Sequence, residues 1–351
     1  MKKLRKWLAL CLCAAAVIAA FAGCSKTAES TPVDINDFRV TSYITADSIA
    51  DPAALCEADF DIVTDIILFS CATFDETGAL QVQTQMMETA LENLQPILAS
   101  RDIPVYLNVL GPDPDGTFDD WNEQMAAKGE LHKQAFESGV LEDNIMSVAN
   151  QYNFDGVYFD YEFPIEQEYW DAYNAFLVRM NNKLGDKLLG IALPDWDINL
   201  SDEAIAAVDR IEAMLYDIYD DDGRHATYEL CAELSEKYAE AGIDKAKVDF
   251  GLPFYARPTD NDAYWYAWRD YCDLVAGDGA YTDEAIGKTF YFNTPDIVTQ
   301  KTNYAIENGF GGMMVWNYSY DLPSTDDRSL LRAVGNAIDT AKSKQTQNAA
   351  Q

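Results

Sequence analysis

The chain has 351 residues, 48% of them hydrophobic, and a formal charge of −34 at pH 7. This length suits one large domain or two modest ones with a sizeable core. The negative charge excludes nucleic-acid binding, which needs a cationic surface to displace counterions, and favours a neutral or cationic substrate over a polyanion.

The N-terminus has the pattern of an export signal. A basic start precedes an apolar run over residues 7–22, which predicts a signal peptide over residues 1–23. The run is shorter than the roughly 20 residues of a membrane-spanning helix. Its end, F-A-G-C, resembles the cleavage box of bacterial lipoproteins. We therefore expect a lipid on Cys24, a polar tether over residues 24–36, and an extracytoplasmic protein anchored to the cell membrane; an ordinary signal peptide is the alternative.

Strand and helix patterns alternate through the rest of the chain. Apolar runs typical of strands lie at residues 38–44, 62–71, 105–110, 154–164, 188–193, 210–216, 248–252 and 312–316. Helical stretches lie at residues 85–98, 123–150, 166–184, 226–242, 295–308 and 327–343. Such alternation predicts an α/β fold, with a parallel sheet covered by helices. Eight units over residues 37–343 predict a closed (β/α)8 TIM barrel, followed by a polar tail over residues 344–351.

A segment between the seventh strand and its helix, about residues 258–289, is rich in aromatic and turn residues. It predicts a short inserted region over the mouth of the barrel. Its aromatic side chains provide either faces for stacking sugars or a small core of the insertion itself, and both readings stay open. These residues are Tyr264, Trp265, Tyr266 and Trp268.

Cysteine and histidine give little support to other chemistries. No spacing singles out a disulfide, and we favour buried free thiols at Cys56, Cys71, Cys231 and Cys272. The two histidines, His132 and His225, are not near other plausible ligands, so neither a metal site nor a histidine triad is indicated. We expect both histidines at the surface, no cofactor, and a monomer.

The fourth strand carries two carboxylates. Asp160 and Glu162 lie two residues apart in the run FDGVYFDYEFP, so on a strand both point to the same face. At the C-terminal end of a barrel strand they would project into the mouth, where barrel enzymes keep their active sites. A close pair of carboxylates is the usual equipment for cleaving a glycosidic bond. The alternative is a pair of solvated loop residues.

Four motifs in chain order resemble those of the family 18 glycoside hydrolases, the chitinase-like barrels. The run with Asp155, Gly156, Asp160 and Glu162 is similar to the family's D-G-x-D-x-D-x-E strand. Residues 214–217 match M-x-Y-D of the sixth strand, and residues 251–257 match G-x-P-x-Y-x-R of the seventh. The eighth strand ends in Trp316.

The resemblance implies roles for the residues of these motifs. Glu162 would be the general acid that protonates the leaving oxygen, and Asp160 would hold the N–H of the substrate's 2-acetamido group, whose carbonyl oxygen attacks the anomeric carbon. Tyr216 would assist the acetamido group as a third catalytic residue. Trp316 would form the floor of the site. The remaining substrate-binding positions would be Asp217, Met214, Tyr255, Arg257, Tyr43 and Asp155.

Two departures from the family pattern stand out. Tyr158 replaces the middle aspartate, so Asp160 loses the partner with which it would share a proton; a phenol does not exchange charge at neutral pH. We expect a shifted pH optimum or a lower rate. The third strand has Asn108-Val109-Leu110-Gly111 where the family has S-x-G-G. The short insertion also implies a shallow, open groove.

Three hypotheses follow. The first is a retaining hydrolase of β-1,4-linked N-acetylglucosamine, acting on chitin or chitooligosaccharides. The second is an endo-β-N-acetylglucosaminidase acting on N-glycans or other N-acetylated glycans. The third is a non-catalytic, glycan-binding lipoprotein. The intact Glu162 favours the enzymes, whereas Tyr158 keeps the third hypothesis open.

Overall fold

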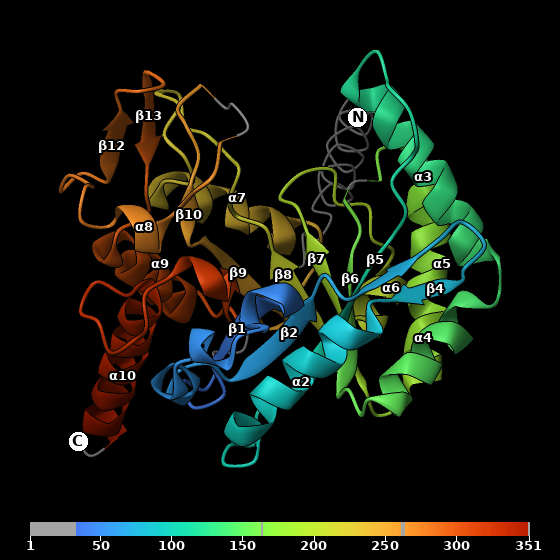
Figure 1. Cartoon of the computed structure of the whole chain (residues 1–351), viewed down its shortest axis with the longest axis horizontal. Coiled ribbons are helices and arrows are strands. Elements are labelled where there is room, and N and C mark those ends of the chain that lie inside the picture. Colours follow the sequence, from blue (N-terminus) through green and yellow to red (C-terminus); the bar gives the residue numbers. More distant parts are fainter. Residues whose placement is uncertain (1–32, 163, 261–263, 350–351) are drawn as a thin grey trace, which may run out of the picture.

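The computed structural model describes residues 33–162, 164–260 and 264–349. These residues form a closed barrel of parallel strands with helices outside it (Figure 1). The barrel strands are β1 (Arg39–Thr45), β2 (Asp65–Phe69), β5 (Val105–Leu110), β6 (Gly156–Asp160), β7 (Leu188–Leu193), β8 (Arg210–Ala213), β9 (Val248–Pro253) and β14 (Gly312–Trp316). Each pairs in parallel with its neighbours, and pairing of β2 with β5 and of β1 with β14 closes the ring. The predicted (β/α)8 barrel is confirmed.

Helices surround the barrel (Figure 1). They are α2 (Thr84–Leu98), α3 (Trp121–Glu137), α4 (Leu141–Gln151), α5 (Gln167–Leu184), α6 (Asp202–Ala207), α7 (Tyr228–Glu240), α8 (Trp268–Tyr271), α9 (Pro295–Glu307) and α10 (Leu330–Ala349). Short 3-10 turns are η1 (Ala46–Ile49), η2 (Pro52–Ala54), η3 (Glu57–Asp61), η4 (Lys245–Lys247) and η5 (Tyr318–Tyr320). In α5, Tyr169, Tyr173, Phe176 and Met180 recur at helical spacing and are buried.

Helix boundaries differ from the sequence prediction in two places. The helix predicted over residues 123–150 is two helices, α3 and α4, because Gly139 has a φ of +74° and an α-helix cannot continue through that conformation. The last helix, predicted to end at residue 343, continues to Ala349, and its residues 344–348 are exposed. The short helix α6 was not predicted.

Two small structural units lie at the C-terminal end of the barrel. One is a hairpin of β3 (Ala72–Phe74) and β4 (Leu80–Val82), which follows β2. The other is the insertion after β9, with pairs β10 (Tyr255–Ala256)–β11 (Tyr266–Ala267) and β12 (Ala280–Asp283)–β13 (Lys288–Tyr291). The insertion therefore has regular structure of its own, standing above the barrel in Figure 1.

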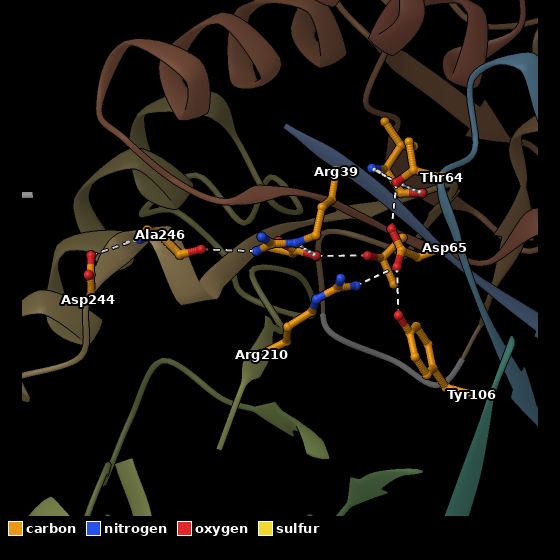
Figure 2. A network of polar contacts seen from close by, with 10 residues as sticks. Arg39, Thr64, Asp65, Tyr106, Arg210, Asp244 and Ala246 are labelled. Atoms are coloured by element: carbon orange, nitrogen blue, oxygen red, sulfur yellow. Dashed lines mark hydrogen bonds and ion pairs between the residues drawn. The ribbon is translucent and has the colours of Figure 1, made fainter. Parts of the chain in front are cut away.

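The lower part of the barrel interior, at the N-terminal ends of the strands, contains charged side chains (Figure 2). Arg39 donates to Asp249 at 2.5 Å, and Asp249 also accepts from the Thr41 hydroxyl at 2.8 Å. Arg210 donates to Asp65 in the same region, and the Tyr106 hydroxyl donates to Asp65 at 2.9 Å. Figure 2 shows Arg210 and Tyr106 reaching Asp65 from different strands. These buried carboxylates are thus each paired with an arginine, as burial of a charge requires.

The remaining predictions about the chain's ends and thiols have mixed outcomes. Cys56, Cys71, Cys231 and Cys272 are all free, with Cys71 and Cys231 buried and the other two partly exposed. Over the described ranges, no helix combines the length and hydrophobicity needed to cross a bilayer. The signal peptide, Cys24 and most of the tether lie outside the described residues and stay predictions.

Candidate active site

The two acids of β6 reach a pocket at the C-terminal end of the barrel. Asp160 is the last residue of β6, and Glu162 follows two residues later. The pocket has a volume of about 260 Å³. It is lined by Phe69, Leu110, Lys128, Asp160, Glu162, Tyr216, Asp217, Tyr255, Trp265 and Trp316. Side chains from five barrel strands or their extensions thus converge on the acids.

The protonation of the pair is asymmetric. Burial, and then the charge of Asp160, raise the pKa of Glu162 to about 8. Burial raises the pKa of Asp160 to about 6, against the opposing effects of Lys128 and of a contact with Glu162. Between these values the proton of the pair resides on Glu162 and the negative charge on Asp160. This is the state that a general acid beside an ionised carboxylate requires.

Lys128 of α3 is a cationic neighbour of the acids. Its ammonium lies 2.8 Å from the Asp113 carboxylate, and its positive charge lowers the pKa of both Asp160 and Glu162. Lys128 therefore sets how far burial can move these two pKa values. Nothing in the sequence pattern had pointed to it, because it lies on a helix that contributes no motif.

Asp217 is held by contacts on all sides. Its Oδ1 accepts from the Tyr255 hydroxyl at 2.6 Å, and its Oδ2 lies 3.1 Å from the Arg257 guanidinium. Its backbone, at a φ of +57°, directs the N–H to Nε2 of His225 at 3.0 Å. Burial acts to raise the pKa of Asp217, but the contacts with His225, Tyr255 and Arg257 outweigh it and lower the pKa. Asp217 is thus a fixed carboxylate acceptor beside Tyr216.

An aromatic floor and wall complete the pocket. Trp316 packs edge-on against Phe69 at 4.9 Å and Tyr43 at 5.3 Å between ring centroids, which fixes the indole beneath the acids. Trp265 stacks on Tyr255 at 5.0 Å and lies beside Arg257. Trp265 remains 47% exposed, so part of the indole is accessible to a ligand. Flat aromatic faces of this kind stack on the apolar faces of sugar rings.

The pocket combines groups that suit acid-assisted chemistry on a sugar. Among residues 33–162, 164–260 and 264–349, no three His, Cys, Asp or Glu side chains gather in a way that could hold a metal ion. A protonated carboxyl, an ionised neighbour, a phenol and aromatic faces together suit the cleavage of an acetal bond in a sugar.

Comparison with known proteins identifies the family. The family described as "Glycosyl hydrolases family 18" matches residues 39–321. The chain belongs to this family. Endochitinase 1 of Metarhizium robertsii is 23% identical over 251 residues, 55% of this chain and 58% of the relative's length. The aligned region thus spans little more than half of that curated relative.

Solved structures agree on the fold. A chitinase, ChiB, from the chitin utilization locus of Flavobacterium johnsoniae superposes with a TM-score of 0.65 at 22% identity, covering 86% of this chain and 94% of that one. A chitinase-like agglutinin from Robinia pseudoacacia superposes with a TM-score of 0.64 at 16% identity, covering 85% and 99%. The same barrel therefore occurs in proteins described as an enzyme and as an agglutinin.

Most residues predicted from the family 18 motifs meet in the pocket. Asp160, Glu162, Tyr216, Asp217, Tyr255 and Trp316 line it, and Arg257 contacts it through Asp217 and Trp265. Tyr43 and Met214 are buried just below, in the cluster that supports the pocket floor, and they do not line it. Their predicted contact with substrate stays a prediction.

Asp155 is the exception among the predicted site residues. It precedes β6, at the end of the strand opposite Asp160, and its carboxylate accepts from the Val105 backbone N–H at 2.8 Å. Five residues of strand separate it from Asp160, about 16 Å at the rise of a β-strand. Its predicted role in substrate binding is therefore corrected: Asp155 ties β6 to β5.

The prediction of surface histidines was wrong. His132 is 1% exposed and stacks on Tyr161 at 4.2 Å, and burial lowers its pKa to about 3. His225 is 2% exposed and supports Asp217. An isolated histidine in the sequence carries no signal of such partners, because Tyr161 and Asp217 reach the histidines only in the folded barrel.

The insertion's aromatic residues divide between the two readings left open. Tyr266 stacks on Tyr271 and Phe290 at 4.3 and 4.1 Å, and Trp268 is buried, with its indole N–H donated to the Arg328 carbonyl. These two form the core of the insertion. Trp265 instead lines the pocket, and Tyr264 is exposed.

Proposed function

We propose that this family 18 barrel is a retaining glycoside hydrolase that cleaves β-1,4-linked N-acetylglucosamine in chitin or chitooligosaccharides. The observation that carries the proposal is the placing of Glu162 and Asp160, two buried acids whose pKa values are both raised, in one pocket with Tyr216, Asp217 and Trp316. We further propose that the protein works outside the cytoplasmic membrane, anchored by a lipid on Cys24.

The reaction would proceed with help from the substrate. The sugar at the cleavage point stacks on Trp316, and Glu162 protonates the leaving glycosidic oxygen. Asp160 accepts a hydrogen bond from the acetamido N–H, so that the acetamido carbonyl oxygen attacks the anomeric carbon from the opposite face. Tyr216 donates to that oxygen as charge develops. Glu162, now ionised, then takes a proton from the water that opens the intermediate, which restores the original anomeric configuration.

The shape of the cleft favours accessible chains. The insertion contributes one exposed indole, Trp265, to one side of the pocket. Short chitooligosaccharides, or loops of longer chains, fit such a site better than a crystalline surface. Two cations at the pocket, Lys128 and Arg257, are each engaged by an aspartate, which also suits a neutral glycan.

Two other functions have some support. An endo-β-N-acetylglucosaminidase acting on N-glycans or other N-acetylated glycans would use the same acids. A glycan-binding lipoprotein without activity is favoured by Tyr158 at the middle position of the motif and by the likeness to an agglutinin barrel. The raised pKa of Glu162, which suits a general acid, weighs against the function without activity.

A hydrolysis assay separates the three. The domain from about Thr31 onward is incubated with fluorogenic chitobiose and chitotriose glycosides, beside Glu162→Gln. We expect release by the wild type and loss of about a thousandfold in kcat for the variant, because Gln cannot donate the proton. Oligosaccharide binding without release would overturn hydrolysis in favour of glycan capture. Neither binding nor release would redirect the search to N-glycans.

A further inference from the structure

A second cavity lies beside the residues that hold Asp217 in place. It has a volume of about 190 Å³, against about 260 Å³ for the catalytic pocket, and the two share no lining residue. Its walls come from the starts of α7 and α9 and from the insertion, which lie together at one side of the barrel (Figure 1). The cavity is several times larger than a single water, whose share of liquid volume is about 30 Å³.

Two buried polar atoms at this cavity have no partner. His225 and Asn293 are each 2% exposed, and both line the cavity. Nδ1 of His225 and Oδ1 of Asn293 make no hydrogen bond with any described residue. The other polar atom of each side chain is engaged, since His225 Nε2 accepts from the Asp217 N–H at 3.0 Å and Asn293 Nδ2 donates to the Ala226 carbonyl at 3.2 Å. Native proteins keep few buried polar groups unpaired, so these two atoms indicate a hydrogen-bonding ligand.

A hydroxyl group suits both atoms. Asn293 Oδ1 can only accept a hydrogen bond, because the amide orientation is fixed by donation to a carbonyl. With Nε2 of His225 accepting from a backbone N–H, Nδ1 carries the hydrogen and donates; in the other tautomer it would accept. A hydroxyl both donates and accepts, so it serves Asn293 and either tautomer of His225. A carboxylate could not donate to Asn293, and an ammonium could not accept from His225.

The rest of the lining suits a sugar ring. Tyr228 and Tyr291 are half-buried and contribute aromatic rings, which stack on the apolar faces of sugars. Arg224 and Gln300 are exposed polar residues of the lining that can bond further hydroxyls. The volume is below the roughly 300 Å³ at which sites for drug-sized ligands begin. The cavity therefore suits one ring rather than an oligosaccharide.

A short loop over residues 217–226 joins this cavity to the catalytic pocket. Asp217 at its start has a φ of +57° and Ala226 at its end has a φ of +47°, and neither is glycine. The Ala226 N–H donates to the Ile218 carbonyl at 2.8 Å, which closes the loop. Non-glycine residues in this conformation cluster at ligand sites and switch regions. One end of the loop thus lines the catalytic pocket and the other end lines the second cavity.

We propose that this second cavity binds one neutral, hydroxyl-rich sugar ring, and that its occupancy is coupled to Asp217 through His225 and the loop over residues 217–226. The binding goes beyond the proposed function, because it requires no hydrolysis. The coupling has a regulatory meaning only with that function, since Asp217 acts there on the substrate. A neutral sugar released by the proposed reaction belongs to the ligand class of the second cavity.

The test observes His225 directly by nuclear magnetic resonance. The chain has two histidines, so labelling histidine alone with 15N gives two sets of ring signals, which His132→Phe assigns. The domain from about Thr31 onward is titrated with N-acetylglucosamine. We expect the Nδ1 signal of His225 to shift saturably, with a Kd on the order of 1 mM for a ligand of this size, and the His132 signals to stay in place.

Three variants locate the binding. Ile297→Trp places an indole at the cavity wall and should weaken the titration at least tenfold. Glu307→Trp is the matched control, because Glu307 is exposed on the same helix and does not line the cavity. Trp316→Leu removes the floor of the catalytic pocket and should leave the His225 shift intact. A shift that is lost in W316L and kept in I297W would place the sugar in the catalytic pocket alone and overturn the proposal.

Two further measurements test the ligand class and the coupling. N-methylacetamide has the acetamido group without ring hydroxyls and should cause no shift; an equal shift would overturn recognition through hydroxyls. In W316L, the amide signal of Asp217 should move together with His225, because the two share a hydrogen bond. An Asp217 amide that stays in place while His225 shifts would overturn the coupling.

The outcomes also separate this proposal from the hydrolase. An active enzyme whose His225 signal does not respond to N-acetylglucosamine would overturn the second site alone. A saturable shift in a protein that cleaves no glycoside would support the second site and overturn the hydrolase. Thermal melting of each variant shows whether it is folded, and Ile297→Phe serves in place of I297W if the larger indole prevents folding.

Discussion

The mouth and the lower interior of the barrel both bury carboxylates, yet they treat them in opposite ways. Below, Asp249 and Asp65 each meet an arginine at close range, with hydroxyl donors completing the contacts. At the mouth, Asp160 and Glu162 lie in contact with each other, and the nearby Lys128 forms its ion pair with Asp113. Carboxylates thus hold strands together through ion pairs in the lower layer, whereas in the upper layer their pKa values are raised.

The difference teaches what distinguishes a reactive acid from a structural one. Burial is common to both layers, so burial alone does not mark an active site. An active-site acid is marked by too few opposite charges and hydrogen bonds to offset its burial, so that its pKa is shifted. Substitutions in the two layers should therefore have separable effects on stability and on turnover.

The largest effect is expected in the lower layer. Arg39→Met leaves the Asp249 carboxylate buried without its ion pair, which should lower the free energy of unfolding by about 3–5 kcal/mol. Urea denaturation followed by tryptophan fluorescence measures this. The double variant R39M/D249L should recover much of the loss, because no isolated charge remains. Equal stability of R39M and wild type would contradict the structural role assigned to this pair.

Next comes the upper layer. Asp160→Asn should reduce kcat by about a hundredfold, because the amide cannot supply the ionised acceptor for the acetamido N–H. Stability should be unchanged or higher, since a carboxyl whose pKa is raised by burial disfavours the folded state when ionised. Parallel kinetics and denaturation on the same preparation test both. A large loss of stability would place Asp160 with the structural acids.

The pH dependence sharpens the comparison further. Activity needs Asp160 ionised, which occurs above about pH 6, and Glu162 protonated, which holds below about pH 8. The wild-type rate should therefore peak near neutrality. Lys128→Met removes a positive charge that lowers both pKa values, so both limbs of the profile should move to higher pH. Limbs that stay in place would show that Lys128 does not act on the pair.

The smallest expected effect concerns the insertion. Trp265→Ala should raise KM about three- to tenfold by removing a stacking face, with kcat and stability nearly unchanged because the indole is half exposed. Tyr266→Ala is the matched control, since Tyr266 packs within the insertion and should reduce stability instead. Equal kinetics and equal thermal melting of the two variants would contradict the separate roles assigned to Trp265 and Tyr266.

The sequence predicted the barrel because its strands are local patterns. The runs at residues 105–110, 188–193 and 312–316 are strands with those bounds, since continuous apolar residues needed no distant partner to be recognised. The break between α3 and α4 was missed because Gly139 sits in a stretch of otherwise helical spacing. The residue at which a helix ends can depend on a single glycine, whereas the presence of a helix or strand depends on many residues.

The site was predictable only where a motif carried it. Asp160, Glu162, Tyr216 and Trp316 follow directly from the strand ends that bear them. Asp155 belongs to the same motif, but it lies at the wrong end of its strand to meet substrate. Lys128, which lines the pocket, and His225, which supports Asp217, come from a helix and a loop, so nothing in their local sequence indicates where they point.

Gly190 couples the side-chain choices of two neighbouring strands. With the Tyr158 ring lying where a Cβ would be, position 190 admits no other residue while the tyrosine is present. Replacing Tyr158 with a short acid would in turn leave an empty space over the glycine, which the surrounding strands could fill only by moving. A smaller residue at position 158 therefore calls for a larger one at position 190, so the two positions can be exchanged only as a pair.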